Sequence, residues 1–359
     1  MKKIFIYSNS NFSSNKFRIA LHDYINNHGI SCVLKTGRPS FKGLFSRDSF
    51  LFERRLSPIL DIISMIQICA ILTCAKRGSE HVFFSAKLSF VSAISSLILT
   101  LLGFNRRLHF VIEGLGQLEF WGGTMILKLF IRFVLNTLVE RGSKVSFLNP
   151  DDWTFFVLNG LKVSSNIMLA GPVGLPEDLI KSATIKGGRR LTKNVIRLVF
   201  CSRFIANKGI LEFIEFCNEI NFKKSALYLA NGFDSLFEDK CASDIDKFVG
   251  HVYFNREFRD ELRAGDVLFL LSSREGFPMI VQESLVLGVP VIAINVPGSN
   301  VAVLQNVNGV LIDNVTINHL KEALDIVEAN YLRFSGNGRH LAASWFSQLH
   351  FINGAGINV

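Results

Sequence analysis

The sequence lacks any pair of cysteines in the close spacing that metal-binding and redox motifs require. Its six cysteines are scattered along 359 residues, and no Cys-x-x-Cys pair occurs. This spacing argues against a structural zinc site or a redox-active dithiol. The apolar run after Lys2 and Lys3 is too short for the core of a secretory signal. We therefore expect reduced thiols in a cytoplasmic protein.

Long hydrophobic runs are also absent. The three most apolar stretches are residues 59–75, 90–104 and 125–139. None contains about 18 uninterrupted apolar residues, the length at which a membrane-spanning helix is expected. Asp61 interrupts the first stretch, and Lys128 interrupts the third. These stretches predict core or interfacial helices rather than membrane spans.

Acidic residues are scarce in the first part of the chain. Residues 1–150 hold 19 of the 39 Lys and Arg residues but only 8 of the 30 Asp and Glu residues. Such a surface attracts an anionic partner, either nucleic acid or acidic lipid. No nucleic-acid-binding motif is found, so nucleic acid is not expected. Residues 41–56 mix aromatic and basic side chains as interfacial segments do, although a packed loop with solvated charges has the same composition. We expect a peripheral protein on the inner face of the cytoplasmic membrane.

Short apolar segments alternate with helical patterns along both halves of the chain. In the first half the predicted strands are residues 4–8, 32–35, 82–85, 108–112 and 145–148, and the predicted helices are residues 16–28, 59–75, 90–102 and 125–139. The second half repeats the alternation from Val195 to Ile312. This pattern predicts an α/β fold with parallel, doubly wound sheets. Glycine and proline between Gly171 and Pro176 indicate a boundary, so we expect domains at 1–175 and 176–359.

Two glutamates in the second half bracket a turn and the start of a helix. The apolar runs 267–271 and 289–294 on either side are typical of buried parallel strands, and Pro278 suits a first helical position. The unpaired N–H groups and positive dipole of a helix start favour phosphate. Glu275 precedes this start, and Glu283 lies roughly 8 Å further along the helix at about 1.5 Å per residue. One carboxylate is then placed for a sugar and the other for a ribose, whereas isolated acids here would be solvated surface residues.

Two cations follow another predicted strand. Arg203 and Lys208 come after the run 195–201 and before Gly209. We expect them to aim at the same phosphate position from the side opposite Glu275. Fixed cations there would stabilise a leaving diphosphate without a metal ion. Either residue alone would be interpreted as an ordinary surface cation.

The Glu-x7-Glu segment and Cys201-Ser-Arg-Phe-Ile-Ala-Asn-Lys-Gly together resemble the signature of retaining glycosyltransferases of family 4. Matches of the same kind occur at residues 227–232, 251–256, 297–300 and 306–312. In the first half, Glu113-Gly-Leu-Gly and residues 147–153 resemble a branch similar to enzymes that assemble capsule and O-antigen glycans on a lipid carrier. The resemblance spans roughly residues 3–330. The family's usual Gly-Val-Asp segment is Gly171-Pro-Val here.

The resemblance implies the GT-B fold, in which two Rossmann-like domains with parallel sheets face each other across a cleft. It implies transfer of a hexose or N-acetylhexosamine from a UDP-sugar, with retention of anomeric configuration. The reaction is a front-face one in which the leaving phosphate helps to deprotonate the acceptor. Glu275 would contact the donor sugar and Glu283 the ribose, with Arg203, Lys208 and Glu275 as the catalytic set. The implied donor-binding residues are Arg203, Lys208, Phe254, Arg256, Glu275, Gly276, Phe277, Pro278, Met279, Ile280 and Glu283.

The first domain would bind the acceptor and face the membrane. The implied acceptor is a saccharide linked to undecaprenyl diphosphate. The residues expected on the acceptor side are Glu113, Gly114, Leu115, Gly116 and Lys87, although the glycine loop is equally compatible with a simple turn.

Neither a metal ion nor another cofactor is expected, since the nucleotide sugar is a substrate. Asp244-Ile-Asp246 has the Asp-x-Asp form of a metal-binding motif, but it falls in a polar, helical stretch, and chance is the better account. Two alternatives stay open. One is a GT-B sugar-nucleotide epimerase, which would need acid and base residues that we do not find. The other is a non-catalytic scaffold that binds a membrane or a partner.

Overall fold

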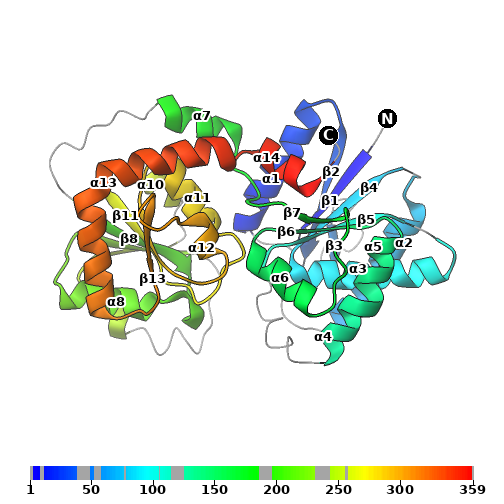
Figure 1. The fold of residues 1–359 in the computed structure, drawn as a ribbon, viewed down its shortest axis with the longest axis horizontal. Coiled ribbons are helices and arrows are strands. Elements are labelled where there is room, and N and C mark those ends of the chain that lie inside the picture. The colour runs from blue at the N-terminus through cyan, green and yellow to red at the C-terminus, as the bar shows by residue number, and fades with distance from the viewer. Residues whose placement is uncertain are drawn as a thin grey trace. The chain divides into compact units, whose positions relative to one another are not determined.

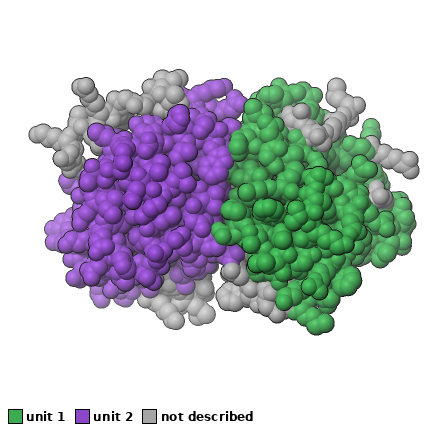
Figure 2. All heavy atoms as spheres, viewed as in Figure 1, with its two compact units in different colours: residues 1–176, 348–359 green, residues 177–347 purple. Residues whose placement is uncertain are grey.

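The structure is a computed structural model that describes residues 3–8, 12–38, 49–51, 58–76, 78–104, 106–114, 125–185, 196–230, 243–254 and 258–357. The chain divides into two compact units, drawn in different colours in Figure 2. Unit 1 comprises residues 1–176 and 348–359, and unit 2 comprises residues 177–347. Residues 348–357, assigned above to the second domain, thus group with unit 1.

Unit 1 contains a seven-stranded sheet in the order β3-β2-β1-β4-β5-β6-β7, with parallel pairing throughout. Figure 1 shows helices packed around it. The strands are β1 (Lys3–Ser8), β2 (Ser31–Arg38), β3 (Ser49–Leu51), β4 (Glu80–Phe84), β5 (Leu108–Ile112), β6 (Lys144–Phe147) and β7 (Ile167–Leu169). The helices are α1 (Phe12–Asn27), α2 (Pro58–Cys74), α3 (Ala86–Leu101), α4 (Met125–Leu129), η2 (Phe130–Leu135), α5 (Asn136–Glu140), α6 (Pro150–Leu158) and α14 (Gln348–Ala355).

Unit 2 contains a six-stranded parallel sheet in the order β10-β9-β8-β11-β12-β13. The strands are β8 (Arg197–Arg203), β9 (Ser225–Ala230), β10 (His251–Phe254), β11 (Asp266–Leu270), β12 (Val291–Ile294) and β13 (Gly309–Ile312). The helices are α7 (Glu177–Ile185), η3 (Ala206–Lys208), α8 (Ile210–Glu219), α10 (Phe258–Glu261), α11 (Met279–Val286), α12 (Ser299–Ala302) and α13 (Ile317–Trp345). Both units are therefore Rossmann-like, as the alternation of strands and helices predicts.

Each unit has its own aromatic-rich core. Phe83, Phe110 and Phe147 come from three adjacent strands of unit 1 and are fully buried. In unit 2, Phe213 of α8 packs against Phe269 of β11 with ring centroids 5.4 Å apart. All five residues of β11 are buried, as its unbroken apolar sequence predicts. The strand is therefore covered on both of its faces.

The last helix, α14, belongs to unit 1. Its Phe351 is fully buried, with its ring 6.1 Å from that of Phe84. Just after α14, the carbonyl of Gly356 accepts a hydrogen bond from the Lys144 ammonium of β6. Among the residues that the structure describes, no helix is both long enough and apolar enough to span a membrane.

Candidate functional site

The strand order of unit 2 reverses between β8 and β11. These two strands are neighbours at the centre of the sheet, and the chain winds outward from them in opposite directions. Ligands of open parallel sheets bind outside the carboxyl ends of the strands at such a switch point. Arg203 ends β8, and Glu275 lies five residues beyond the end of β11. The predicted catalytic residues therefore lie at the position that the topology favours.

Lys208 and Glu275 form a partly buried ion pair at this edge. The Lys208 Nζ atom donates to Glu275 Oε1 over 2.7 Å, and the two side chains are only 14% and 18% exposed. The two side chains, which the sequence analysis expects on opposite sides of the phosphate position, thus contact each other directly. The reason is local: the N–H of Ser273 donates to the carbonyl of Asn207 over 3.1 Å, which joins the loop after β11 to the turn that carries Lys208.

Gly209 makes that turn possible. It has a left-handed conformation, with φ at 75°, between η3 and α8. A Cβ atom there would lie 2.4 Å from the Leu271 Cβ and 2.5 Å from the Leu271 carbonyl oxygen. Only glycine combines this backbone conformation with this close approach. In the Lys-Gly pair of the motif, backbone geometry thus explains Gly209, and the charge that contacts Glu275 explains Lys208.

Arg203 adds a second, half-buried cation at the end of β8. Burial lowers the pKa of its guanidinium, and the nearby charge of Glu275 opposes that effect. Arg203 and Lys208 thus both interact electrostatically with Glu275, beyond the ends of β8 and β11.

The turn at Pro297 and Gly298 supports Glu275 from the next loop. The Glu275 N–H donates to the Pro297 carbonyl over 3.2 Å. A Cβ atom on Gly298, which has φ at 83°, would lie 2.3 Å from the Glu275 carbonyl oxygen. Pro297 and Gly298 thus pack tightly against the backbone of Glu275 and Gly276.

The start of α11 follows Glu275. Pro278 occupies the N-cap position and makes no side-chain cap hydrogen bond. Phe277 is 5% exposed, and its ring contacts those of Trp345 and Phe346 edge-on, with centroids 5.6 and 5.9 Å away. The Phe277 side chain therefore packs in the core of unit 2, and a ligand could contact only its backbone. Half-buried positions on this helix are those of Met279, Ile280 and Glu283.

The remaining predicted residues are only partly described. Phe254 ends β10 and is 52% exposed. Arg256, Leu115 and Gly116 lie outside the described residues. Glu113 and Gly114 directly follow β5 in unit 1. Lys87 is the second residue of α3, and its ammonium pairs with Asp61 of α2 over 2.6 Å.

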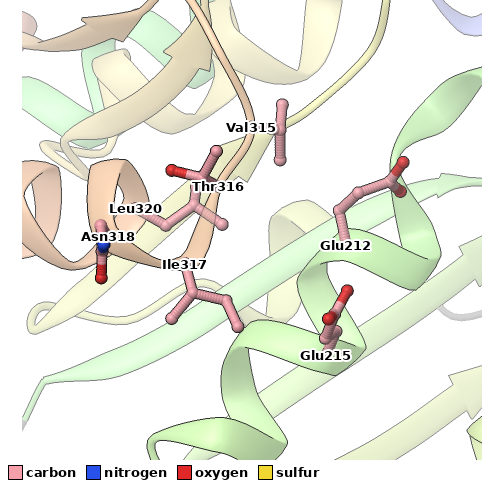
Figure 3. A pocket seen from close by; sticks show the side chains of 7 residues that line it. All are labelled: Glu212, Glu215, Val315, Thr316, Ile317, Asn318 and Leu320. Carbon is pink, nitrogen blue, oxygen red and sulfur yellow. The ribbon is translucent and has the colours of Figure 1, made fainter.

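A cavity of about 290 Å³ lies elsewhere in unit 2, between α8 and the start of α13. Figure 3 shows the carboxylates of Glu212 and Glu215 among its lining side chains. Two acids would repel a diphosphate, so this cavity does not fit the donor. Over the described part of the chain, no cluster of His, Cys, Asp or Glu is arranged to hold a metal ion. Asp244 and Asp246 lie in a short helical segment, residues 243–246, as the sequence predicts.

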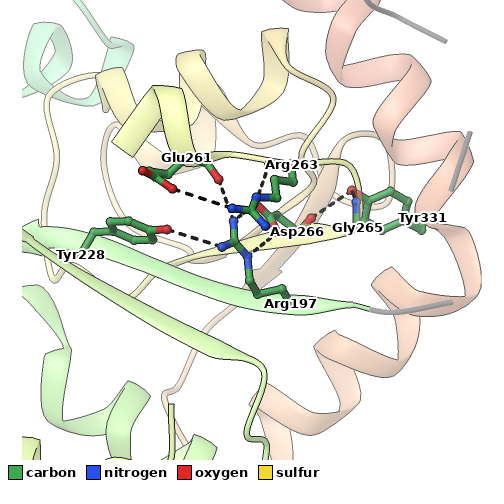
Figure 4. Close-up of polar contacts among 7 residues, drawn as sticks. All are labelled: Arg197, Tyr228, Glu261, Arg263, Gly265, Asp266 and Tyr331. Carbon is green, nitrogen blue, oxygen red and sulfur yellow. Dashed lines mark hydrogen bonds and ion pairs between the residues drawn. The ribbon is translucent and has the colours of Figure 1, made fainter. Parts of the chain in front are cut away.

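A buried network at the opposite ends of β8 and β11 was not predicted. The Arg197 guanidinium donates to both carboxylate oxygens of Asp266, over 2.8 and 2.7 Å, and to the Glu261 carbonyl. The Tyr331 hydroxyl of α13 donates to the Asp266 carbonyl (Figure 4). The sign of this network in the sequence is Asp266, an acidic residue at the first position of the otherwise apolar strand β11. The network joins the starts of the two strands whose other ends carry the candidate site.

Comparisons with known proteins define the fold class. The chain superposes on the Anabaena protein HepE in complex with UDP-glucose with a TM-score of 0.68 at 16% identity, over 99% of this chain and 98% of that one. For the sucrose-phosphate synthase of Thermosynechococcus elongatus the TM-score is 0.72 at 15% identity, with 99% and 98% covered. For the lipopolysaccharide outer core galactosyltransferase WaaB it is 0.62 at 13% identity, again with 99% and 98% covered. The fold is GT-B, as expected from the sequence.

A family model matches part of the sequence. Residues 183–340 match the family model described as Glycosyl transferases group 1. The matched segment includes every donor-side residue predicted above. A search of curated proteins found no significant match.

Proposed function

We propose that the chain is a retaining glycosyltransferase that moves a hexose or N-acetylhexosamine from a UDP-sugar to a lipid-linked glycan acceptor. The observation that carries this proposal is the Lys208–Glu275 pair at the switch point of unit 2. It lies within the segment that matches the glycosyltransferase family, and a protein of the same fold, HepE, is known in complex with UDP-glucose.

The arrangement suits a donor with a diphosphate next to a sugar. Lys208 and Arg203 would stabilise the charge that grows on the departing diphosphate, together with the N–H groups at the start of α11. Glu275 would accept hydrogen bonds from sugar hydroxyls, and Glu283 from a ribose. The leaving phosphate would take the acceptor proton, so the proposal needs no protein nucleophile and no metal ion.

The reaction class is tested by substituting the paired residues. We expect Lys208→Met and Glu275→Gln each to lower turnover at least 100-fold, because each removes a charge that contacts the donor. The measurement is transfer from a panel of radiolabelled UDP-sugars to an undecaprenyl-diphosphate-linked saccharide, with and without EDTA. Lys181→Met is the matched control, since Lys181 forms an exposed pair with Glu177 in the same unit.

The alternatives give different outcomes in this assay. A sugar-nucleotide epimerase would convert the free donor without any acceptor, and a scaffold would do neither. Near-wild-type transfer by Lys208→Met would refute the site. Activity that EDTA abolishes and Mn²⁺ restores would refute metal independence.

We further propose that unit 1 binds membranes of acidic lipid, in a capsule or O-antigen pathway. Residues 41–56, on which the sequence hypothesis rests, lie mostly outside the described residues. Described support comes from Met125, Leu129 and Phe133, which are four residues apart and 74%, 41% and 65% exposed. Lys128 and Arg132 are exposed on the same helical segment. Apolar and basic side chains alternating on one exposed surface fit an acidic bilayer surface.

Liposome sedimentation tests this part separately. Lys128→Glu with Arg132→Glu should weaken binding to phosphatidylglycerol vesicles and leave the weak binding to phosphatidylcholine vesicles unchanged. Neutralising Arg47, Arg54 and Arg55 together should have the same effect. Unchanged binding in both variants would contradict the proposal.

A further inference from the structure

Helix α2 of unit 1 is apolar on both of its faces. Its sequence, from Pro58 to Cys74, contains one charged residue, Asp61, and no lysine or arginine. One face carries Ile68 and Leu72, which are buried in the core of unit 1. A helix that is apolar all round is ordinarily covered on every side. We therefore expect the second face of α2 to be covered as well.

That second face is exposed in the single chain. Ile59, Ile62 and Ile66 are 73%, 58% and 63% exposed. They follow one another at intervals of three and four residues, and the exposed residues Ala70 and Thr73 continue the stripe. This spacing places the side chains on one side of a helix, as in a seam between two packed helices. Single exposed apolar residues are ordinary, whereas a continuous stripe marks a binding surface.

The end of α3 widens this apolar stripe. Helices α2 and α3 lie side by side (Figure 1), and the Ser95 hydroxyl of α3 donates to the Met65 carbonyl of α2 over 3.4 Å. Just beyond α3, the Arg106 guanidinium donates to the Ala75 carbonyl, which follows α2, over 2.8 Å. The ends of the two helices are therefore neighbours. The α2–α3 surface, as we call it, comprises the three isoleucines above and the exposed residues Ile98, Leu101, Leu102 and Phe104.

Charge indicates what covers the α2–α3 surface. All seven of its residues are uncharged, so it offers nothing to match an acidic or basic partner. An interfacial membrane helix has a polar face rich in lysine and arginine, which α2 lacks. Residues 1–150 hold 19 Lys and Arg against 8 Asp and Glu, so two copies of unit 1 repel each other except across an uncharged face. A second copy of the chain fits these conditions.

The stripe on α2 is also complementary to itself when two copies pack antiparallel. With a two-fold axis beside Ile66, Ile62 of each copy lies against Ala70 of the other. Ile59 likewise lies against Thr73. Away from the axis a large side chain thus meets a small one, which allows close packing across a two-fold interface. Fully buried, the seven side chains would contribute roughly 700 Å² per copy, at about 100 Å² each, close to the roughly 800 Å² of a standard interface.

We propose that the chain forms a two-fold symmetric homodimer through the α2–α3 surface, with the two α2 helices antiparallel. The inference goes beyond the proposed function and does not depend on it. Its contact area is smaller than that of an obligate dimer, so the two chains separate at micromolar concentrations.

Sedimentation velocity on the full chain tests the dimer. The wild type should shift from the mass of one chain, 40.2 kDa, to twice that mass between about 1 and 100 μM. Ile66→Glu should weaken association roughly 100-fold or more, because it places two like charges against each other in an apolar contact. Leu332→Glu is the matched control, since Leu332 is an exposed leucine on α13 of unit 2. The control should associate as the wild type does.

Disulfide trapping tests the antiparallel arrangement. A disulfide forms only where the two Cα atoms come within about 7 Å of each other. The background is Cys74→Ser, which removes an exposed native thiol from the end of α2. In it, Ile66→Cys should link to itself under mild oxidation. Ile62→Cys should not link to itself, but it should link to Ala70→Cys in an equal mixture of the two variants.

Four results would overturn the inference. Three are a wild type that keeps the mass of one chain throughout, an Ile66→Glu variant that dimerises as the wild type does, and equal linking at all three cysteine positions. The fourth is binding to phosphatidylcholine vesicles that Ile66→Glu abolishes while no dimer forms in solution, which would assign the surface to lipid. Melting temperatures identify loss of folding, and if Ile66→Glu does not fold, the milder cysteine variants still decide.

Discussion

At the scale of single residues, Gly209 shows most directly how the sequence constrains the site. An alanine there would combine positive φ with a Cβ atom 2.4 Å from that of Leu271. We expect Gly209→Ala to lower the free energy of unfolding by about 2–3 kcal/mol, since strain and steric displacement add. It should also reduce UDP binding, because the turn that carries Lys208 must shift. Urea denaturation and calorimetry measure the two effects.

Gly336 provides the matched control. It lies on the exposed face of α13, and nothing lies within 4 Å of the position that its Cβ would take. Gly336→Ala should leave stability unchanged or raise it by about 0.5–1 kcal/mol, as alanine does inside helices. If both substitutions had the same effect, the structural role assigned to Gly209 would be wrong.

The sequence identifies these residues more readily than it identifies their partners. Arg203, Lys208 and Glu275 are found by their places after apolar strands. Lys208 and Glu275 are 67 positions apart, and no spacing along the chain encodes their contact. Arg18 lies in an unremarkable helical pattern, and its burial depends on contacts with residues distant in sequence, such as Phe84 and Glu113.

At the scale of secondary-structure elements, the Arg197–Asp266 pair fixes β8 beside β11. Asp266 is 1% exposed, and burial raises the pKa of its carboxyl while Arg197 opposes that rise. Arg197→Met would leave this carboxylate without its strongest partner. We expect a loss of about 3–5 kcal/mol in unfolding free energy at pH 7, as for other broken buried pairs. Urea denaturation of the full chain provides the measurement.

A double substitution distinguishes two causes of the stability loss in Arg197→Met, the unpaired charge of Asp266 and the lost packing of Arg197. Arg197→Met with Asp266→Asn removes the charge and keeps a group that can accept from the Arg263 N–H. This variant should recover at least half of the stability lost in Arg197→Met. A double variant less stable than the single one would show that the unpaired carboxylate is not the cause.

The order of elements was largely predictable, and the exceptions have physical causes. Predicted strands and helices of unit 1 agree with the structure to within a few residues, because buried parallel strands are short and uniformly apolar. The three-residue strands β3 and β7 were missed, since edge strands this short carry little pattern. Helix α13 was not predicted either. Its polar sequence obscures a helical apolar stripe at Leu320, Leu324, Val327 and Tyr331.

At the scale of the whole molecule, three buried titratable groups in unit 1 make its stability depend on pH. Burial lowers the pKa of His81 to about 4 and that of His109 to about 3, with smaller effects from nearby cations. Burial also raises the pKa of Asp152 to about 6, despite its hydrogen bond from Asn149. The histidine contributions are complete above pH 6.5 and are lost as pH falls. The Asp152 contribution is complete below about pH 4 and is lost as pH rises through 6.

The histidines should dominate on acidification. At about 1.4 kcal/mol per pH unit, the two histidines would together lose roughly 6 kcal/mol between pH 6.5 and 4, and Asp152 would return only about 3. We therefore expect unit 1 to become less stable below pH 6. His109→Gln should flatten the dependence of melting temperature on pH between 4.5 and 7.5, because it removes one titrating group. Asp152→Asn should steepen it, because it removes the opposing one. Identical slopes in the wild type and both variants would show that these buried groups do not control the acid response.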